Sequence, residues 1–210
     1  LTHIVNQAVL VDLRVVLSEY LKNCIVVFCI LMLCSGASEL TMSQWASSFA
    51  EMGLGVSKAV GDLLGPCAFA VLMGTARVIY AKYSERMNLS KFMLISAVLC
   101  IVSYLIAALS EQPIVSLLGC ALCGFSVGIM WPGSISVSSR TCPKGGTAMF
   151  AFLALAGDLG AMVSPAMVGS ISEMAGGELK TGLLVATIFP VILVCGLLAL
   201  TKTAIKTSRV

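Results

Sequence analysis

The chain has 210 residues, of which 59% are hydrophobic and only 11% are charged, whereas a typical soluble domain is about 25% charged. This composition excludes an ordinary soluble domain and predicts an all-α, polytopic membrane protein. The net charge of +3 comes from basic residues spread over short joints, without a basic run or an aromatic platform, so it does not indicate a nucleic-acid partner.

Residues 1–23 mix charged and polar side chains with leucine and valine. We interpret them as a cytoplasmic loop or surface segment. Six apolar segments follow, each close to or above the ~20 residues that span a bilayer as a helix. The sequence therefore predicts a six-helix transmembrane bundle over residues 24–201 and a cytoplasmic tail over residues 202–210. The six segments are 24–50, 59–80, 92–109, 114–138, 147–173 and 181–201.

Lysine and arginine gather on one side of this bundle. If successive joints alternate between the two sides, Lys58 and Lys180 lie on one side and the eleven other basic residues lie on the side that holds both termini. Basic residues mark the cytoplasmic side, so we expect both termini to be cytoplasmic in the cell (inner) membrane. The eleven are Arg14, Lys22, Arg77, Lys82, Arg86, Lys91, Arg140, Lys144, Lys202, Lys206 and Arg209.

Two apolar segments each carry a deep carboxylate, Glu39 in the first and Asp158 in the fifth. At ~1.5 Å per residue, both lie near the middle of a ~30 Å hydrocarbon core, and no equally deep basic residue accompanies them. A carboxylate there is costly unless it is protonated, paired or in contact with water. We expect at least one to titrate in a water-filled cavity, as a proton carrier or as an acceptor for a polar solute. The alternative is a protonated acid bonded to a neighbouring helix.

Gln44, nearer the outer face, and Trp131, toward the cytoplasmic end of the fourth segment, are further candidates for solute contact. A tryptophan near an interface is more often a membrane anchor, and both interpretations remain open for Trp131. The glycines and prolines inside the segments have two interpretations as well. Small residues let helices pack closely, and proline or glycine lets the fourth and fifth helices bend during transport.

The cysteines do not form a metal-binding pattern. Most lie within apolar segments, where a free cysteine behaves as a small buried hydrophobe. Cys120 and Cys123 have the spacing of metal ligands, but neither a second pair nor a histidine lies near them, so we expect no metal site. The chain also has no glycine-rich phosphate loop, so we expect neither a cofactor nor an ATP-driven step.

The most specific motif is the joint at residues 81–91, Ala-Lys-Tyr-Ser-Glu-Arg-Met-Asn-Leu-Ser-Lys. It resembles the loop between the second and third helices of one half of a major facilitator superfamily transporter. The family pattern is Gly, three residues, Asp-Arg, one residue, then Gly-Arg-Arg or Lys. Glu85 and Arg86 occupy the acid–base pair. Asn88 occupies the second glycine, where asparagine tolerates a left-handed turn, and Ala81 replaces the first.

Other stretches share this resemblance. Gly74-x-x-Arg77, just before the loop, is similar to the family, and residues 119–140 and 151–177 resemble the fourth and fifth helices of its C-terminal half. Within the family the sequence most resembles bacterial fucose-permease-like sugar transporters.

The resemblance implies one six-helix half of a secondary transporter, in a family built from two such bundles around a midplane site. An N-terminal half, in the same or a separate chain, would complete the cavity. The expected function is proton-coupled movement of a small polar solute across the bilayer by alternating access, with no enzymatic activity. The resemblance implies a sugar as the solute class. Glu39, Asp158, Gln44 and Trp131 would serve the solute or the proton. Arg77, Glu85 and Arg86 would form the gating loop.

Two alternatives stay open at this point. Gly157-Asp158 is similar to part of the Gly-x-Gly-Asp motif of intramembrane aspartyl proteases. However, position 155 is leucine and no Tyr-Asp pair supplies a second aspartate. The other alternative is a membrane scaffold that transports nothing.

Overall fold

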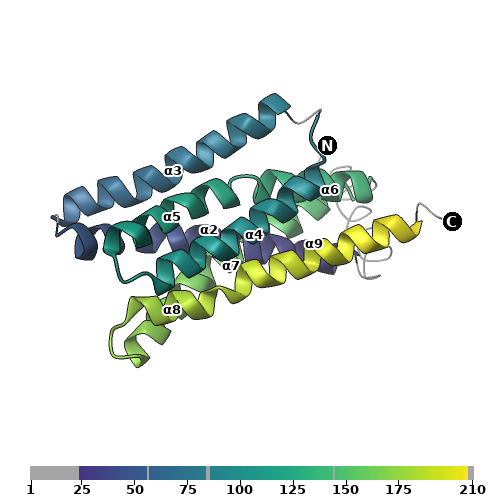
Figure 1. The fold of residues 1–210 in the computed structure, drawn as a ribbon. Coiled ribbons are helices and arrows are strands. Elements are labelled where there is room, and N and C mark those ends of the chain that lie inside the picture. Colours follow the sequence, from purple (N-terminus) through teal and green to yellow (C-terminus); the bar gives the residue numbers. More distant parts are fainter. Residues whose placement is uncertain (1–23, 56, 84–85, 144, 208–210) are drawn as a thin grey trace, which may run out of the picture.

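The computed structural model describes residues 24–207, except for residues 56, 84–85 and 144. Every element in these residues is a helix (Figure 1). The expected surface segment at residues 1–23 lies outside the described residues, and so do Glu85 and residues 208–210. The elements are α2 (Cys24–Leu54), α3 (Lys58–Tyr83), α4 (Leu89–Leu109), α5 (Pro113–Val127), α6 (Met130–Thr141), α7 (Gly146–Met174), α8 (Leu179–Ala186) and α9 (Ile188–Thr207).

Six spans in the described residues are long and apolar enough to cross a membrane, and they coincide with the six predicted segments. Two of them consist of two helices each, α5 with α6 and α8 with α9. The prediction of an all-α bundle with six transmembrane helices is therefore confirmed. The last helix extends to Thr207, so part of the segment expected as a tail continues α9.

Local sequence explains where several helices begin and end. Pro113 opens α5, where its missing N–H costs nothing because the first helical N–H groups have no partner within the helix. Gly55 follows the end of α2 with a φ of 60°, and Gly176 and Gly177 follow α7 with φ of 79° and 91°. Glycine adopts these left-handed conformations without strain, so the joints after α2 and α7 can turn sharply.

Helix α2 is the centre of the bundle. It packs against α3, α5, α6, α7 and α9, and it contributes buried residues to both hydrophobic cores, Leu31 to one and Met42 to the other. Helix α3 is the least buried span and lies along one edge (Figure 1). The bundle is therefore organised around the segment that also carries Glu39.

Helices α2 and α7 run in parallel and touch through their backbones. A side chain on Gly36 would collide with the backbone of Gly157, and one on Gly160 would collide with the carbonyl of Leu33. One turn farther along, the Thr41 and Ser164 hydroxyl oxygens lie 2.6 Å apart in a buried hydrogen bond. Close packing, one of the two predicted roles for these glycines, is therefore present in the structure.

The fourth and sixth spans are interrupted, whereas α7 continues through Pro165. The fourth span breaks at Gly128–Ile129 and the sixth at Thr187. Each break is followed by a proline, Pro132 or Pro190. A proline has no N–H to give to the carbonyl four residues earlier, which explains why the helical ladder is interrupted there.

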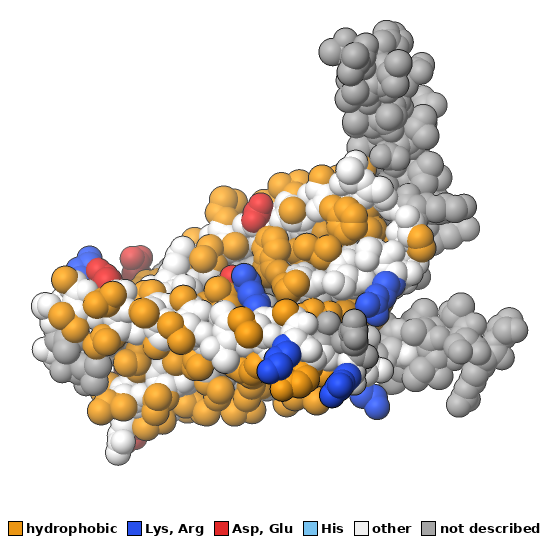
Figure 2. All heavy atoms as spheres, turned by 90° about the horizontal axis from the view of Figure 1, so that it is seen from above, with side chains coloured by type: hydrophobic (Ala, Val, Ile, Leu, Met, Phe, Trp, Pro, Cys, Tyr) orange, Lys and Arg blue, Asp and Glu red, His pale blue; other side chains and the backbone are white. Residues whose placement is uncertain are grey.

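The surface is suited to lipid. Hydrophobic side chains cover most of the face seen in Figure 2, and charged side chains are few on it. Leu63 and Val78 of α3, Ile95 of α4 and Met162 of α7 are each more than half exposed. Such exposure would be costly in water but not in a bilayer.

The close contact between α2 and α7 predicts a loss of stability on adding one methyl group. Gly160→Ala should lower the free energy of unfolding by about 1–3 kcal/mol, because the carbonyl of Leu33 occupies the space the methyl group needs. Gly169→Ala is the matched control in the same helix, since its methyl group would lie 3.6 Å from Trp45, an ordinary contact. Thermal unfolding of both purified variants in lipid nanodiscs measures the difference. Equal melting temperatures would contradict the close contact.

Candidate functional site

Glu39 lies on α2 in a polar turn with Ser38 and Thr41. Its side chain is half-buried, and its Oε2 atom is buried without a hydrogen-bond partner among the described residues. Arg77 of α3 is close enough to interact electrostatically with the carboxyl group. The two side chains do not form a direct ion pair. Glu39 is therefore a carboxyl group inside the bundle with one oxygen still free to accept a hydrogen bond.

The Arg77 side chain extends from near the loop end of α3 toward the middle of the fourth span. Its Nε atom donates a hydrogen bond to the Gly128 carbonyl oxygen at 3.1 Å, and its Nη2 atom lies 3.7 Å from the Met73 sulfur. Gly128 is in the middle of the fourth span. The Arg77 residue is exposed overall, but its Nε atom lies at the level of Gly128. The expectation that no basic residue shares the depth of the carboxylates is therefore wrong, because this long side chain extends along the span from a Cα nearer the end of α3.

Asp158 lies at a similar level to Glu39 but in different surroundings. It follows Gly157, which touches Gly36 of α2, one turn from Glu39. However, the Asp158 side chain is exposed on the surface of α7, whereas Glu39 is half-buried. The structure therefore brings the two helices together at this level without giving the two acids a shared environment.

Trp131 is half-buried and lies directly after the break in the fourth span. A side chain on Gly157 would lie 2.6 Å from its Cζ2 atom, so the indole ring rests against α7 beside Asp158. Trp131 also packs against the larger hydrophobic core.

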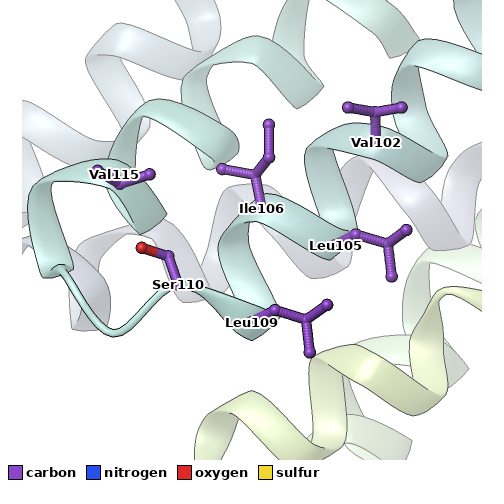
Figure 3. A pocket seen from close by; sticks show the side chains of 6 residues that line it. All are labelled: Val102, Leu105, Ile106, Leu109, Ser110 and Val115. Carbon is purple, nitrogen blue, oxygen red and sulfur yellow. The ribbon is translucent and has the colours of Figure 1, made fainter.

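A surface groove of about 420 Å³ lies along α4 at its end near Ser110 (Figure 3). None of the candidate site residues lines it. Apart from the Ser110 hydroxyl, the lining is aliphatic, so the groove suits hydrocarbon better than a polar solute. It is formed by Val102, Leu105, Ile106, Leu109, Ser110 and Val115.

A family model described as the Major Facilitator Superfamily matches residues 2–165, well over half of the chain. The chain belongs to the major facilitator superfamily. Members of this family are membrane transporters, which fits a function in transport and not in catalysis. A search of curated proteins and a search of solved structures each found no match. Nothing therefore identifies the solute, and the finer resemblance to fucose permeases remains a prediction.

The family loop between α3 and α4 is described in part. Arg86 is exposed, and its backbone N–H bonds to the Tyr83 carbonyl at 2.9 Å, while its expected partner Glu85 lies outside the described residues. Asn88 corrects the sequence-based expectation. Its φ is −73°, not left-handed, and its side chain accepts a hydrogen bond from the Lys91 backbone N–H. Asn88 therefore acts as the N-cap of α4.

One polar residue of this transporter chain, Tyr104, was not singled out from the sequence. The Tyr104 hydroxyl of α4 donates to the Ser38 carbonyl at 2.9 Å, one residue before Glu39. Trp45 packs near Gly169 of α7, and its indole N–H is buried without a partner among the described residues. The neighbouring Gln44 is exposed. A buried tyrosine needs a hydrogen-bond partner, so the lone tyrosine inside the third apolar segment was the available signal.

Cys123 does not form a pair with Cys120, its neighbour in the sequence, but contacts a cysteine on another helix. The sulfur atoms of Cys100 and Cys123 lie 3.8 Å apart across α4 and α5, so Cys123 contacts another helix. Within the described residues no three histidine, cysteine, aspartate or glutamate side chains are grouped so that they could hold a metal ion.

The corrected role of Asn88 predicts a specific pattern of substitutions. Asn88→Ala should lower the free energy of unfolding by about 1 kcal/mol, because the Lys91 N–H loses its acceptor. Asn88→Ser should keep most of the stability, since serine caps a helix equally well but does not favour a left-handed turn. Chemical unfolding of the two variants in the same detergent compares them. If serine is as destabilising as alanine, the side chain is not acting as a cap.

Proposed function

We propose that this major facilitator superfamily chain is one six-helix half of a proton-coupled transporter for a small polar solute. The observation that carries the proposal is the half-buried Glu39 carboxyl with an unpartnered oxygen. In a family of transporters, a carboxyl group inside the membrane that accepts and releases a proton couples the proton gradient to solute movement. Uncharged sugars are the solute class indicated by the resemblance to fucose permeases.

The other site residues receive roles from their positions. Asp158 is the second candidate for a proton carrier or a solute acceptor, because it is exposed at a level similar to that of Glu39. Trp131, against α7 beside Asp158, offers an apolar ring face of the kind on which a sugar ring packs. Gln44, exposed nearer the outer end of α2, offers an amide for hydrogen bonds to hydroxyl groups.

A second six-helix bundle, in the same or a separate chain, would complete the cavity. We propose that it covers the exposed face of α7 around Asp158, because a charged carboxylate on a lipid-facing surface would be costly. Glu85 and Arg86 would then hold the cytoplasmic ends of α3 and α4 together when the cavity is closed on that side.

The carrier mechanism is tested at Glu39. The full-length protein is reconstituted in liposomes and assayed with a panel of radiolabelled hexoses and 6-deoxyhexoses. Glu39→Gln keeps the shape of the protonated acid but cannot release a proton. It should abolish accumulation driven by a proton gradient and leave solute exchange across the membrane largely intact.

Asp158→Asn is the matched variant, because either acid could carry the proton. If Glu39→Gln accumulates a sugar against its gradient at the wild-type rate, Glu39 does not couple transport to protons. If no tested sugar is exchanged or accumulated by the wild-type protein, the proposed solute class is wrong.

The proposed orientation places the α3–α4 loop in the cytoplasm and the α2–α3 joint outside. Lys82, Arg86, Lys91 and Arg140 lie at the end of the bundle where α2 begins, and Lys58 and Lys180 lie at the other end, which fits the positive-inside rule.

In a cysteine-free background, a membrane-impermeant maleimide added to intact cells should label Ser57→Cys and not Asn88→Cys. Labelling of both should occur after the cells are permeabilised. The opposite pattern in intact cells would reverse the topology.

A further inference from the structure

The break in the fourth span leaves the Gly128 backbone carbonyl without its usual donor. The ladder is intact on both sides, since the Gly128 N–H bonds to the Gly124 carbonyl at 3.2 Å and the Gly133 N–H bonds to the Ile129 carbonyl at 2.8 Å. The Gly128 carbonyl would normally bond to the N–H of residue 132, which is proline. An unpaired carbonyl inside a membrane protein is costly, so this oxygen needs a donor from elsewhere.

Arg77 supplies that donor from another helix. Its Nε–H points to the Gly128 oxygen at 3.1 Å. The two backbones approach closely here, because a side chain on Gly128 would lie 2.8 Å from the Met73 carbonyl of α3. A guanidinium group is charged and forms stronger hydrogen bonds than a neutral amide. The side chain therefore fastens α3 to the break and replaces the bond that Pro132 cannot make.

The same guanidinium lies within the electrostatic reach of Glu39. Its Nη2 atom makes a weak contact with the Met73 sulfur, so the group retains strong donors for another acceptor. The Glu39 Oε2 atom lacks a hydrogen-bond partner among the described residues. The charge of Arg77 therefore acts on the Glu39 carboxyl group, while the Oε2 atom of that group has no hydrogen-bond partner among the described residues.

Other charged and titratable groups on the helices around α2 are engaged or directed elsewhere. Asp62 of α3 accepts a hydrogen bond from Ser47, two turns along α2. Asp158 and Glu173 of α7, Arg140 of α6 and Cys195 of α9 are exposed. Lys180 of α8 donates to the Ser110 carbonyl, and Cys123 of α5 contacts Cys100. Cys120 of α5 is fully buried in the second hydrophobic core. Within the described residues, Arg77 is the charged group that acts on Glu39.

We propose that Arg77 is a positioning residue that couples the ionisation of Glu39 to the break in the fourth span. With neutral Glu39, the guanidinium stays on the Gly128 carbonyl and holds the break against α3. When Glu39 ionises, its carboxylate attracts the guanidinium more strongly than a carbonyl does. In its present position the guanidinium does not bond to the Glu39 Oε2 atom, so joining the carboxylate moves the side chain away from the Gly128 oxygen. That oxygen then loses its donor, and α6 is free to move relative to α5. This inference rests on the proposed role of Glu39 as a titrating group, but its test does not need the solute.

The test measures how often the helix opens at the break in the fourth span. The full chain is placed in lipid nanodiscs, and hydrogen exchange of the peptide containing Gly133 is measured against pH after correction for intrinsic rates. In the wild-type protein, exchange should become about tenfold faster, or more, as pH rises through the titration of Glu39, as expected for the loss of a hydrogen bond to a charged group. The fluorescence component that disappears in Trp131→Phe should change over the same pH range.

Four variants separate the steps. Glu39→Gln should keep exchange slow at every pH, and Arg77→Gln should make it fast at every pH. Pro132→Ala gives the Gly128 carbonyl a backbone donor, so exchange should be slow and independent of pH. Arg77→Gln/Pro132→Ala should be as slow as Pro132→Ala alone, which is a rescue that a general loss of packing would not allow. The peptide around Thr187 and Pro190, at the other break, is the internal control and should not respond.

Several results would overturn the proposal. One is a pH-dependent step that persists in Arg77→Gln or in Pro132→Ala, and another is fast exchange in the double variant. If Arg77→Gln does not fold, the Pro132→Ala titration alone decides. The outcome is also distinct from that of the proposed function. A break that titrates in a protein without proton-driven accumulation keeps this inference and rejects the transport mechanism, and accumulation through Glu39 with a break that does not titrate does the reverse.

Discussion

The structure depends on one constraint, which is that a backbone polar group in a bilayer must find its partner within the protein. Six continuous helices would meet it without help. This chain departs from continuity at Gly128 and Thr187, and at the first of these positions a side chain restores the missing bond. The buried hydroxyl groups follow the same rule. Ser38 bonds to the Cys34 carbonyl, and Tyr104 reaches the Ser38 carbonyl from α4.

Much of the fold could be predicted because it depends on quantities that are local in sequence. Span length and hydropathy locate all six transmembrane helices. Close packing is one of two interpretations of the glycines inside them, and the close approach of Gly36 to Gly157 shows it in the structure. Asn88 shows where local reasoning fails. Asparagine suits both a left-handed turn and an N-cap, and the choice depends on whether the Lys91 N–H is within its reach. Only the path of the loop decides that.

The candidate site was less predictable, because counting residues along a helix gives depth but not direction. The count placed Glu39 and Asp158 at similar levels, and the contact between α2 and α7 agrees with it. It could not reveal that one side chain is half-buried near Arg77 and the other is exposed. Arg77 was misjudged for a related reason. Its Cα lies near the end of α3, but an arginine side chain is long enough to carry its charge more than one helical turn away.

A side-chain donor differs from the backbone donor that it replaces in one respect that matters for a transporter. A backbone N–H is fixed to its helix and can leave its acceptor only if the helix unwinds. The guanidinium of Arg77 is attached to the neighbouring helix α3 by a flexible side chain. It can therefore exchange the Gly128 carbonyl for another acceptor while both helices stay intact. Pro132 therefore does more than weaken the fourth span. It transfers one hydrogen bond at mid-span from the helix itself to a charged side chain on a neighbouring helix.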